Sequence, residues 1–200
     1  MDTEAVQIKP GRFTEDEYFE QLKHSEHKLE YLGGIIRMMA GGGPSHNRIC
    51  RNAFRELDRN PANCEVYLSD TAVSISKNHR YFFPDLSAVC ARETELEEGG
   101  LEKIKNPCLI IEVISESTAD YDRGEKFRTY RQLESFREYL LIDSRKLSID
   151  YFYRESGIPW HIRSFYREDQ EVELRTLGVT LPVTAFYEGV ELPPEDDPPQ

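Results

Sequence analysis

The chain has 200 residues, which is enough for one domain with a sizeable hydrophobic core. With 38% hydrophobic and 31% charged residues, its composition is that of a soluble globular protein. Its apolar runs fall short of the roughly 20 residues that a membrane-spanning helix needs, and residues 1–9 contain no apolar signal core. We therefore expect a cytoplasmic protein without a membrane partner.

The formal net charge of −12 argues against a simple nucleic-acid coat protein. The negative charge is unevenly spread, because many of the acidic residues fall in two short segments. These residues are Glu93, Glu95, Glu97 and Glu98, and Glu188, Glu191, Glu195, Asp196 and Asp197. The middle of the chain is therefore close to charge balance.

The four cysteines are Cys50, Cys64, Cys90 and Cys108. None belongs to a C-x-x-C pair, and three lie in apolar periodic segments. This pattern predicts buried thiols in a reducing compartment, and neither a zinc cluster nor a disulfide framework.

The domain organisation expected from composition is simple. Residues 1–12 form a flexible leader, residues 13–191 a single domain, and residues 192–200 a disordered acidic and proline-rich tail. Within the domain, Thr14 is predicted to cap a short helix that runs to about residue 23, because acidic residues fill its first turn.

Glycines mark the next two elements. Gly33-Gly34 stands between two short apolar runs, which predicts a tight β-hairpin. A glycine-rich break then precedes Ser45, which is predicted to cap a second helix that runs to about residue 59. This helix has an apolar row on one side and arginines on the other.

The central part of the chain predicts strands over residues 64–75, 81–90 and 107–114. The last has almost no polar residues, which is typical of a central strand covered on both faces. A helix from Thr118 to about residue 133 leads to a strand over 138–143, and such a crossover implies a parallel pair. The segment that follows alternates like an antiparallel meander, which extends the sheet or covers one side of it.

Two carboxylates and a lysine stand out in this central part. Asp85 lies inside an apolar run, and Glu112 lies inside the central strand, where a charge is costly without a cation, a metal or donors nearby. Asp122 and Lys126 share one face of the next helix. If the strands are neighbours, Asp85 and Glu112 can hold Mg²⁺ through hard oxygen ligands. Lys126 could then orient an attacking water or stabilise developing negative charge on a phosphate.

Each part has another interpretation when it is taken alone. Asp85 could mark a strand-entry turn, Glu112 could pair with a buried arginine, and Asp122 with Lys126 could be a solvent-facing ion pair. Taken together, in this order and spacing, they favour a metal site.

Two further features leave alternatives open. The arginines of the second helix could follow phosphates or form a solvated face. Aromatic residues are dense over 151–166, where they could stack on bases, form a packed sheet or form a dimer interface.

Several motifs then match a known family. They are Pro84-Asp85-Leu86-Ser87, Ile111-Glu112-Val113-Ile114-Ser115 with Ser117-Thr118, Tyr121-Asp122-Arg123-Gly124-Glu125-Lys126-Phe127 with Tyr130, Arg137-Glu138-Tyr139, Ile142-Asp143, Leu29-Glu30-Tyr31 and Ser45-His46. Over residues 13–190 the sequence resembles the Uma2-type (DUF820) family of predicted endonucleases, in the restriction-endonuclease-like PD-(D/E)xK superfamily.

The resemblance implies an α/β fold. Its restriction-endonuclease-like core has a central mixed β-sheet flanked by helices, with an N-terminal helix and hairpin and a C-terminal antiparallel meander. The resemblance also implies metal ligands at Asp85, Glu112 and Val113, Mg²⁺ as the ion with Mn²⁺ as a possible substitute, DNA as the substrate and a homodimer.

The resemblance includes one departure from the superfamily motif. Ile114 stands two residues after the acid, where a lysine is expected, and Lys126 on the following helix fits the role of that lysine. Glu30 and His46 resemble additional acidic and histidine positions of the family site, and Asp70 is a further candidate.

The sequence therefore predicts a metal-dependent endonuclease that hydrolyses DNA phosphodiester bonds. Asp85 and Glu112 hold Mg²⁺, Lys126 assists the attacking water, and Glu30 and His46 complete the catalytic pocket. The alternative is a catalytically inactive binding or scaffold module with the same fold. A glycosidase with two carboxylates fits less well, because Lys126 has no place in that chemistry.

Overall fold

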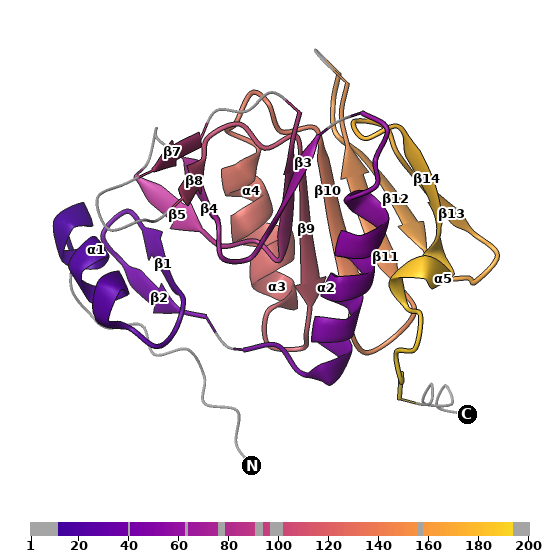
Figure 1. Ribbon diagram of the computed structural model, residues 1–200, viewed down its shortest axis with the longest axis horizontal. Helices are drawn as coiled ribbons and strands as arrows, with labels where there is room; N and C mark the ends of the chain where they lie inside the picture. The colour runs from indigo at the N-terminus through magenta and orange to yellow at the C-terminus, as the bar shows by residue number, and fades with distance from the viewer. Residues whose placement is uncertain are drawn as a thin grey trace.

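The computed structural model describes residues 12–39, 41–62, 64–75, 79–90, 94–96, 102–155 and 158–193. Two six-stranded sheets dominate this part of the chain (Figure 1). The first contains, in order, β2 (Ile36–Met38), β1 (Leu29–Leu32), β5 (Arg80–Phe82), β4 (Ala72–Ile75), β8 (Glu102–Ile104) and β7 (Thr94–Leu96). The second contains, in order, β12 (His161–Phe165), β11 (Ile149–Tyr153), β10 (Glu138–Asp143), β9 (Leu109–Ile114), β6 (Leu86–Val89) and β3 (Glu65–Leu68).

Both sheets are mixed, because β4–β8 and β9–β10 pair in parallel among otherwise antiparallel neighbours. The predicted α/β class with a mixed sheet and flanking helices is confirmed. The prediction of one central sheet was incomplete, because two predicted strands each divide between the two sheets. Residues 64–75 form β3 and β4, and residues 81–90 form β5 and β6. Pro84 has no N–H for a ladder bond, and the chain leaves the first sheet beside it.

The central strand is placed as predicted. All six residues of β9 are buried, which agrees with coverage of both faces. The predicted parallel partner is β10, and the register pairs Leu141 with Glu112. Glu112 therefore stands in the middle of the second sheet.

The N-terminal helix and hairpin agree with the sequence. Helix α1 (Glu15–His24) begins at Thr14 with a capping box, in which Thr14 and Glu17 satisfy each other's backbone N–H groups. Gly33 and Gly34 have φ of 64° and 108° and connect β1 to β2. These left-handed conformations are the reason that glycine is suited to this tight turn.

Helix α2 (Pro44–Leu57) begins two residues earlier than predicted. Gly43 is its N-cap, so the prediction that Ser45 caps the helix was wrong. Pro44 can occupy the first turn because the missing N–H needs no helical partner there. The helix lays Ile49, Ala53 and Leu57 on one face of the second sheet.

The crossover helix lies between the two sheets (Figure 1). It consists of α3 (Ala119–Tyr121), a π-helical turn (Asp122–Lys126) and α4 (Phe127–Tyr130). Thr118 precedes it, as predicted, but its hydroxyl accepts the N–H of Ser115 and makes no helix-capping bond. The helix contributes Tyr130 to an apolar cluster that includes Phe82 of the first sheet and Tyr139 of the second.

The C-terminal meander both extends and covers the second sheet. Strands β11 and β12 add to its edge, while the hairpin β13 (Glu171–Leu174) and β14 (Val179–Pro182) forms a separate pair with α5 (Val183–Phe186) after it. The hairpin and α5 share the apolar cluster of α2. Tyr151, Phe152 and Phe165 are buried, which supports packing as the role of these aromatic residues.

One cysteine prediction was wrong. Cys64 and Cys90 form a disulfide, whereas Cys50 and Cys108 are free thiols. Cys64 precedes β3 and Cys90 follows β6, and the antiparallel register of these strands pairs Glu65 with Val89. The two cysteines therefore face each other one step beyond the ladder, which sequence separation alone does not indicate.

Some predictions fall outside the described residues. These are the leader over 1–12 apart from Arg12, the tail over 192–200 apart from Leu192 and Pro193, and the acidic residues Glu93, Glu97, Glu98, Glu195, Asp196 and Asp197. Within the part of the chain that the structure describes, no helix has the length and apolarity needed to cross a membrane.

Candidate active site

Lys126 lies at the centre of a buried polar cluster between the two sheets. Its Nζ donates a hydrogen bond to Glu112 Oε1 at 3.0 Å. It also lies 3.3 Å from Glu30 Oε1 and 3.3 Å from Asp122 Oδ1. All four side chains are at most 5% exposed, so one ammonium group faces three carboxyl groups away from solvent.

The fold explains why these four residues meet. Glu112 comes from β9 of the second sheet and Glu30 from β1 of the first sheet. Asp122 and Lys126 come from the π-helical turn between the sheets. Single π turns inside helices recur at functional sites. Here the turn places Asp122 and Lys126 on the same side, so the solvent-facing ion pair considered from the sequence is wrong.

Two tyrosines that were not predicted as site residues complete the cluster. The Tyr130 hydroxyl donates to Glu112 Oε1 at 3.1 Å, and the Tyr121 hydroxyl donates to Glu30 Oε2 at 3.2 Å. Burial raises the pKa of Tyr130 well above its ordinary value of 10.0, and the charge of Glu112 adds to this, so the hydroxyl stays a donor. Both tyrosines belong to the sequence motif around Asp122, and this position in the motif could have identified them as site residues.

The electrostatics of the cluster are unbalanced. Burial raises the pKa of Glu112 well above its usual 4.5, and the charges of Asp122, Asp85 and Glu30 raise it further, against the opposing effect of Lys126. For Lys126, burial favours the neutral amine, but the surrounding carboxylates outweigh it and raise the pKa well above 10.5. Glu30 Oε1 is buried and receives no hydrogen bond from the described residues. The cluster therefore has room for additional positive charge.

Asp85 adjoins this cluster at the start of β6. Its Oδ2 accepts the main-chain N–H of Val113 at 2.7 Å and lies 3.2 Å from His46 Nε2. The β6–β9 register pairs Leu86 with Ile111, and one step further it sets Asp85 beside Glu112. Burial alone would lower the pKa of His46, but its hydrogen bond to Asp85 and the charge of that carboxylate give a net increase.

A pocket on the α2 side reaches Asp85 and His46. Its lining also includes Cys50, Arg51 and Leu68. The side chains of Asp85 and His46 are 14% and 19% exposed, in contrast to the fully enclosed Lys126 cluster. The pocket thus gives solvent access to the outer part of the site.

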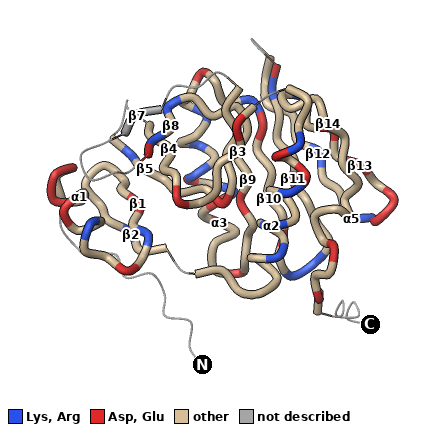
Figure 2. The backbone as a smooth tube through the Cα atoms, viewed as in Figure 1, with Lys and Arg blue, Asp and Glu red and all other residues tan. Residues whose placement is uncertain are grey.

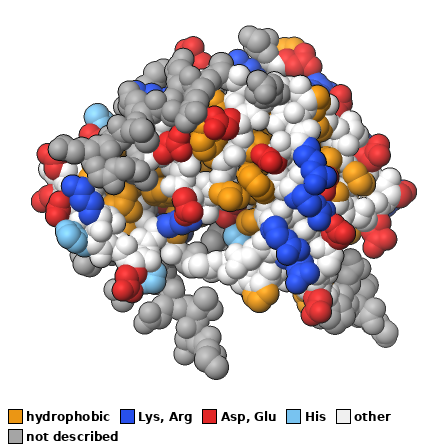
Figure 3. All heavy atoms as spheres, viewed as in Figure 1, with side chains coloured by type: hydrophobic (Ala, Val, Ile, Leu, Met, Phe, Trp, Pro, Cys, Tyr) orange, Lys and Arg blue, Asp and Glu red, His pale blue; other side chains and the backbone are white. Residues whose placement is uncertain are grey.

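Basic residues line α2 next to this pocket. Lys and Arg side chains form a band over the helix on the face shown in Figure 3, and Figure 2 shows the basic positions along its backbone. Arg48, Arg51 and Arg59 are exposed. Arg55 is held by Glu56 and Glu188, so it is less free to bind an external anion.

The structure brings the predicted residues together in two adjoining groups. Glu30, Glu112 and Lys126 form the inner group, and Asp85 and His46 form the outer one. The peptide unit between Glu112 and Val113 connects them, because the N–H of Val113 binds Asp85. Asp70 lies outside both groups: its side chain is 90% exposed and pairs with Lys28 at 2.9 Å.

Two mixed sheets with a helix between them, and acids and a lysine around one central strand, define a restriction-endonuclease-like α/β protein. The model of the Uma2 family, described as "Putative restriction endonuclease", matches residues 16–184. The chain belongs to this family.

The chain is also similar in sequence to two proteins of Synechocystis sp.. The chain is 31% identical over 183 residues to the uncharacterized protein slr1290 of Synechocystis sp., which covers 90% of this chain and 93% of that protein. It is 30% identical over 168 residues to the uncharacterized protein sll1609 of the same organism, and this match covers 83% of this chain and 94% of that protein.

A crystal structure described as a putative nuclease belonging to DUF820 from Anabaena variabilis has a similar fold. The TM-score is 0.70 and the sequence identity is 16%, over 90% of this chain and 99% of that one. At this identity the likeness concerns the fold.

Proposed function

We propose that this protein is a divalent-metal-dependent endonuclease that hydrolyses phosphodiester bonds of DNA. The observation that carries the proposal is the excess of buried carboxyl groups over cations around Lys126. Buried carboxylates without enough compensating charge are costly, and a divalent cation is one way to balance them.

The donor set fits a hard cation such as Mg²⁺, or Mn²⁺ as a substitute. Lys126 and Tyr130 both bind Glu112 through Oε1, and no described residue donates a hydrogen bond to Oε2. Asp85 presents a second carboxylate from the neighbouring strand. The Val113 side chain offers no ligand atom, but its main-chain carbonyl points to the same edge of β9 as its N–H, which faces Asp85. Asp85, Glu112 and the Val113 carbonyl are therefore the proposed ligands.

When bound, the ion would supply the Lewis acidity that draws charge from a phosphate and makes a water molecule more acidic. Lys126 carries its proton as an ammonium group beside Glu112, so its role is to donate. It can orient the attacking water or stabilise negative charge as it develops on the phosphate. Glu30 holds Lys126 in place, and His46 holds Asp85 in place at the solvent-exposed side of the site.

The surface beside the pocket supports a polyanionic substrate. Exposed Arg48 and Arg51 lie on the helix that also carries His46, and exposed Arg59 follows just beyond its C-terminal end. Phosphate contacts position nucleic acid on a protein in this way. The protein acts in the cytoplasm as a homodimer in this proposal, because two sites can cut both strands of a duplex. Edge strand β12, on which Ile162 is 65% exposed, is available for such an association.

Nicking of supercoiled plasmid tests the activity. Wild-type protein with Mg²⁺ or Mn²⁺ should nick the plasmid, and Glu112→Ala and Lys126→Ala should lower the rate about 100-fold or more. Glu171→Ala, at an exposed position on β13, should nick like wild type. Equal nicking by all four proteins would show contamination or a different active centre.

A binding or scaffold module without turnover is the second candidate. The charge of −12 and the direct bond between Lys126 and Glu112 favour it, because a metal would have to enter a site that is already partly paired. Thermal unfolding with and without Mg²⁺ or Mn²⁺ separates the two. An endonuclease should gain stability from the ion, and Glu112→Ala should remove the gain, whereas an inactive module should show little gain in either protein.

A further inference from the structure

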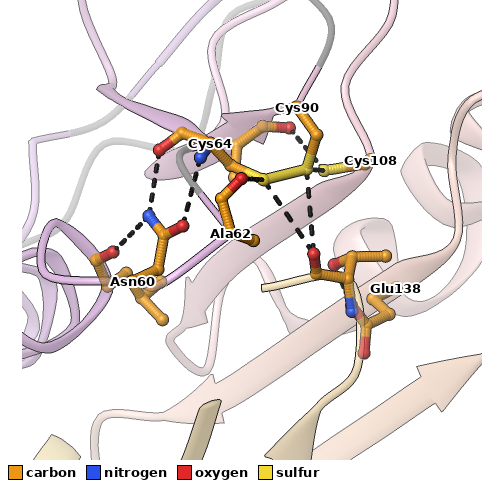
Figure 4. Close-up of a disulfide and its surroundings, with 9 residues drawn as sticks. Asn60, Ala62, Cys64, Cys90, Cys108 and Glu138 are labelled. Carbon is orange, nitrogen blue, oxygen red and sulfur yellow. Dashed lines mark hydrogen bonds between the residues drawn. A yellow bond between two sulfur atoms is a disulfide. The ribbon is translucent and has the colours of Figure 1, made fainter. Parts of the chain in front are cut away.

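Three cysteines meet at the end of the second sheet that lies away from Asp85 (Figure 4). The sulfur atoms of Cys64, Cys90 and Cys108 all lie within 4.8 Å of one another. Cys64 and Cys90 are joined as a disulfide, and Cys108 Sγ lies 3.1 Å from Cys90 Sγ. Strand β6 separates Cys90 from Asp85 by about 17 Å of extended chain, so this cluster is distinct from the candidate active site.

The main chain holds this arrangement independently of the sulfur chemistry. The β3–β6 register places Cys64 opposite Cys90, and the N–H of Cys108 binds the carbonyl of Ala88 at 2.8 Å. Asn60 also accepts the N–H of Cys64 at 3.1 Å. Since these bonds involve no sulfur atom, the three side chains should remain close together when the disulfide is reduced.

The loop on the other side of the cluster is also fixed. The Thr176 carbonyl lies 3.9 Å from Cys64 Sγ and 3.8 Å from Cys90 Sγ. The N–H of Thr176 binds the buried carboxylate of Glu138 at 2.9 Å, and that of Arg175 binds it at 2.8 Å. An oxygen atom and a nearby carboxylate give the cluster negative character, which suits a cation and does not favour an anion.

We infer that, in their reduced state, Cys64, Cys90 and Cys108 form a thiolate site for a thiophilic divalent ion such as Zn²⁺. A thiol or phosphine reductant first gives two electrons to the disulfide, which takes up two protons from water and becomes two thiols, while the reductant is oxidised to a disulfide or a phosphine oxide. The three thiols then release three protons and bind one ion. Zinc–sulfur bonds of about 2.3 Å place tetrahedral thiolates about 3.8 Å apart, within the present spread of the sulfurs.

The third sulfur is the reason to infer a metal site as well as a disulfide. A disulfide uses two cysteines, whereas a metal site uses all three and leaves one position for water or another ligand. Cys90 is exposed, which gives an ion a path from solvent. Burial raises the pKa of the Cys108 thiol, so binding must displace its proton and should strengthen as the pH rises.

Cobalt absorption tests the inference, because Co²⁺ bound by thiolates has a charge-transfer band that oxygen ligands do not give. The protein is reduced with a phosphine, kept free of oxygen and titrated with Co²⁺, then with Zn²⁺. Reduced wild type should develop the band with one Co²⁺ per chain and lose it when Zn²⁺ displaces the cobalt. Oxidised protein should show no band.

Three variants assign the ligands. Cys90→Ser, at the exposed position, and Cys108→Ser should weaken Co²⁺ binding at least about tenfold, while Cys50→Ser on α2 should bind like wild type. Thermal unfolding of each reduced variant checks that it is folded. If Cys108→Ser does not fold, the Co²⁺ affinity of Cys90→Ser alone tests the inference. Glu112→Ala should keep the band, so failure of the active-site proposal does not affect this result.

Two outcomes would overturn the inference. One is the absence of a thiolate band in reduced wild-type protein. The other is a band that survives Cys90→Ser but disappears in Cys50→Ser, since that result would assign thiolate binding to Cys50 beside His46.

Discussion

Asp85 accepts the main-chain N–H of Val113 at 2.7 Å, one residue beyond Glu112 on the central strand. Just before β6 begins, the Asp85 carboxylate thus accepts the Val113 N–H in place of a backbone carbonyl of a neighbouring strand. This bond sets the position of the Asp85 carboxylate through the backbone of β9. The site geometry therefore depends on the fold.

Asp85→Asn should separate the structural role of this side chain from its proposed role as a ligand. Asparagine keeps an oxygen that accepts the Val113 N–H, so the free energy of unfolding should change by less than about 1 kcal/mol. The stabilisation by Mn²⁺ should be lost, because the charge is removed. Urea unfolding with and without Mn²⁺ measures both quantities, and a metal effect equal to that of wild type would exclude Asp85 as a ligand.

Lys126→Met should be strongly destabilising in the metal-free protein. The change leaves three buried carboxyl groups without their shared ammonium group, and breaking such a pair typically costs about 3–5 kcal/mol. Chemical denaturation gives the value. Lys23→Met is the matched control, because its 3.7 Å pair with Glu20 is solvent-exposed and should contribute less than about 1 kcal/mol.

The raised pKa of Glu112 predicts how stability depends on pH. The folded protein retains this proton to a higher pH than the unfolded chain, whose value is near 4.5. The stabilisation is complete below that value and is lost as the pH rises through the raised pKa. The contribution of Lys126 stays constant over the same range, because its own pKa is raised above 10.5.

Glu112→Gln cannot ionise, so it should remove this decline. Without metal, the variant should be as stable as wild type at about pH 5 and more stable by a few degrees in melting temperature at about pH 8. Melting curves across this range, recorded with a chelator present, make the comparison. Parallel curves for the two proteins would show that Glu112 does not titrate as described.

The sequence was sufficient for features that depend on local chemistry. The Gly33-Gly34 turn was predictable because two successive left-handed residues favour glycine, and the Thr14 cap because acidic residues fill the helical turn that follows it. Glu112 was identifiable because a charge in an otherwise apolar strand needs a partner. Its partner Lys126 was found from its spacing to Asp122 and from the family motif that spans residues 121–127.

The features that the sequence did not predict depend on pairing between strands that are distant in the sequence. The run over 81–90 is apolar on both sides of Pro84, so nothing in its periodicity shows that β5 and β6 belong to different sheets. The Cys64–Cys90 disulfide follows from the β3–β6 register, which hydrophobicity does not specify. Burial of Asp122 follows from the first sheet covering the helix, since the i,i+4 spacing is equally typical of an exposed ion pair.

Gly124 offers a way to stabilise the helix that carries Lys126 without changing the site. A Cβ added there would meet nothing within 4 Å, and the residue lies inside the π-helical turn. Gly124→Ala should therefore increase the free energy of unfolding by about 0.4–1 kcal/mol, mainly because the unfolded chain loses conformational freedom. Gly34→Ala is the matched opposite case, because its φ of 108° strains any residue with a Cβ, and it should be destabilised by about 1 kcal/mol or more. Urea unfolding of both variants measures these two changes in the free energy of unfolding. A destabilised Gly124→Ala with weaker metal binding would mean that the π turn needs the freedom of glycine to place Lys126.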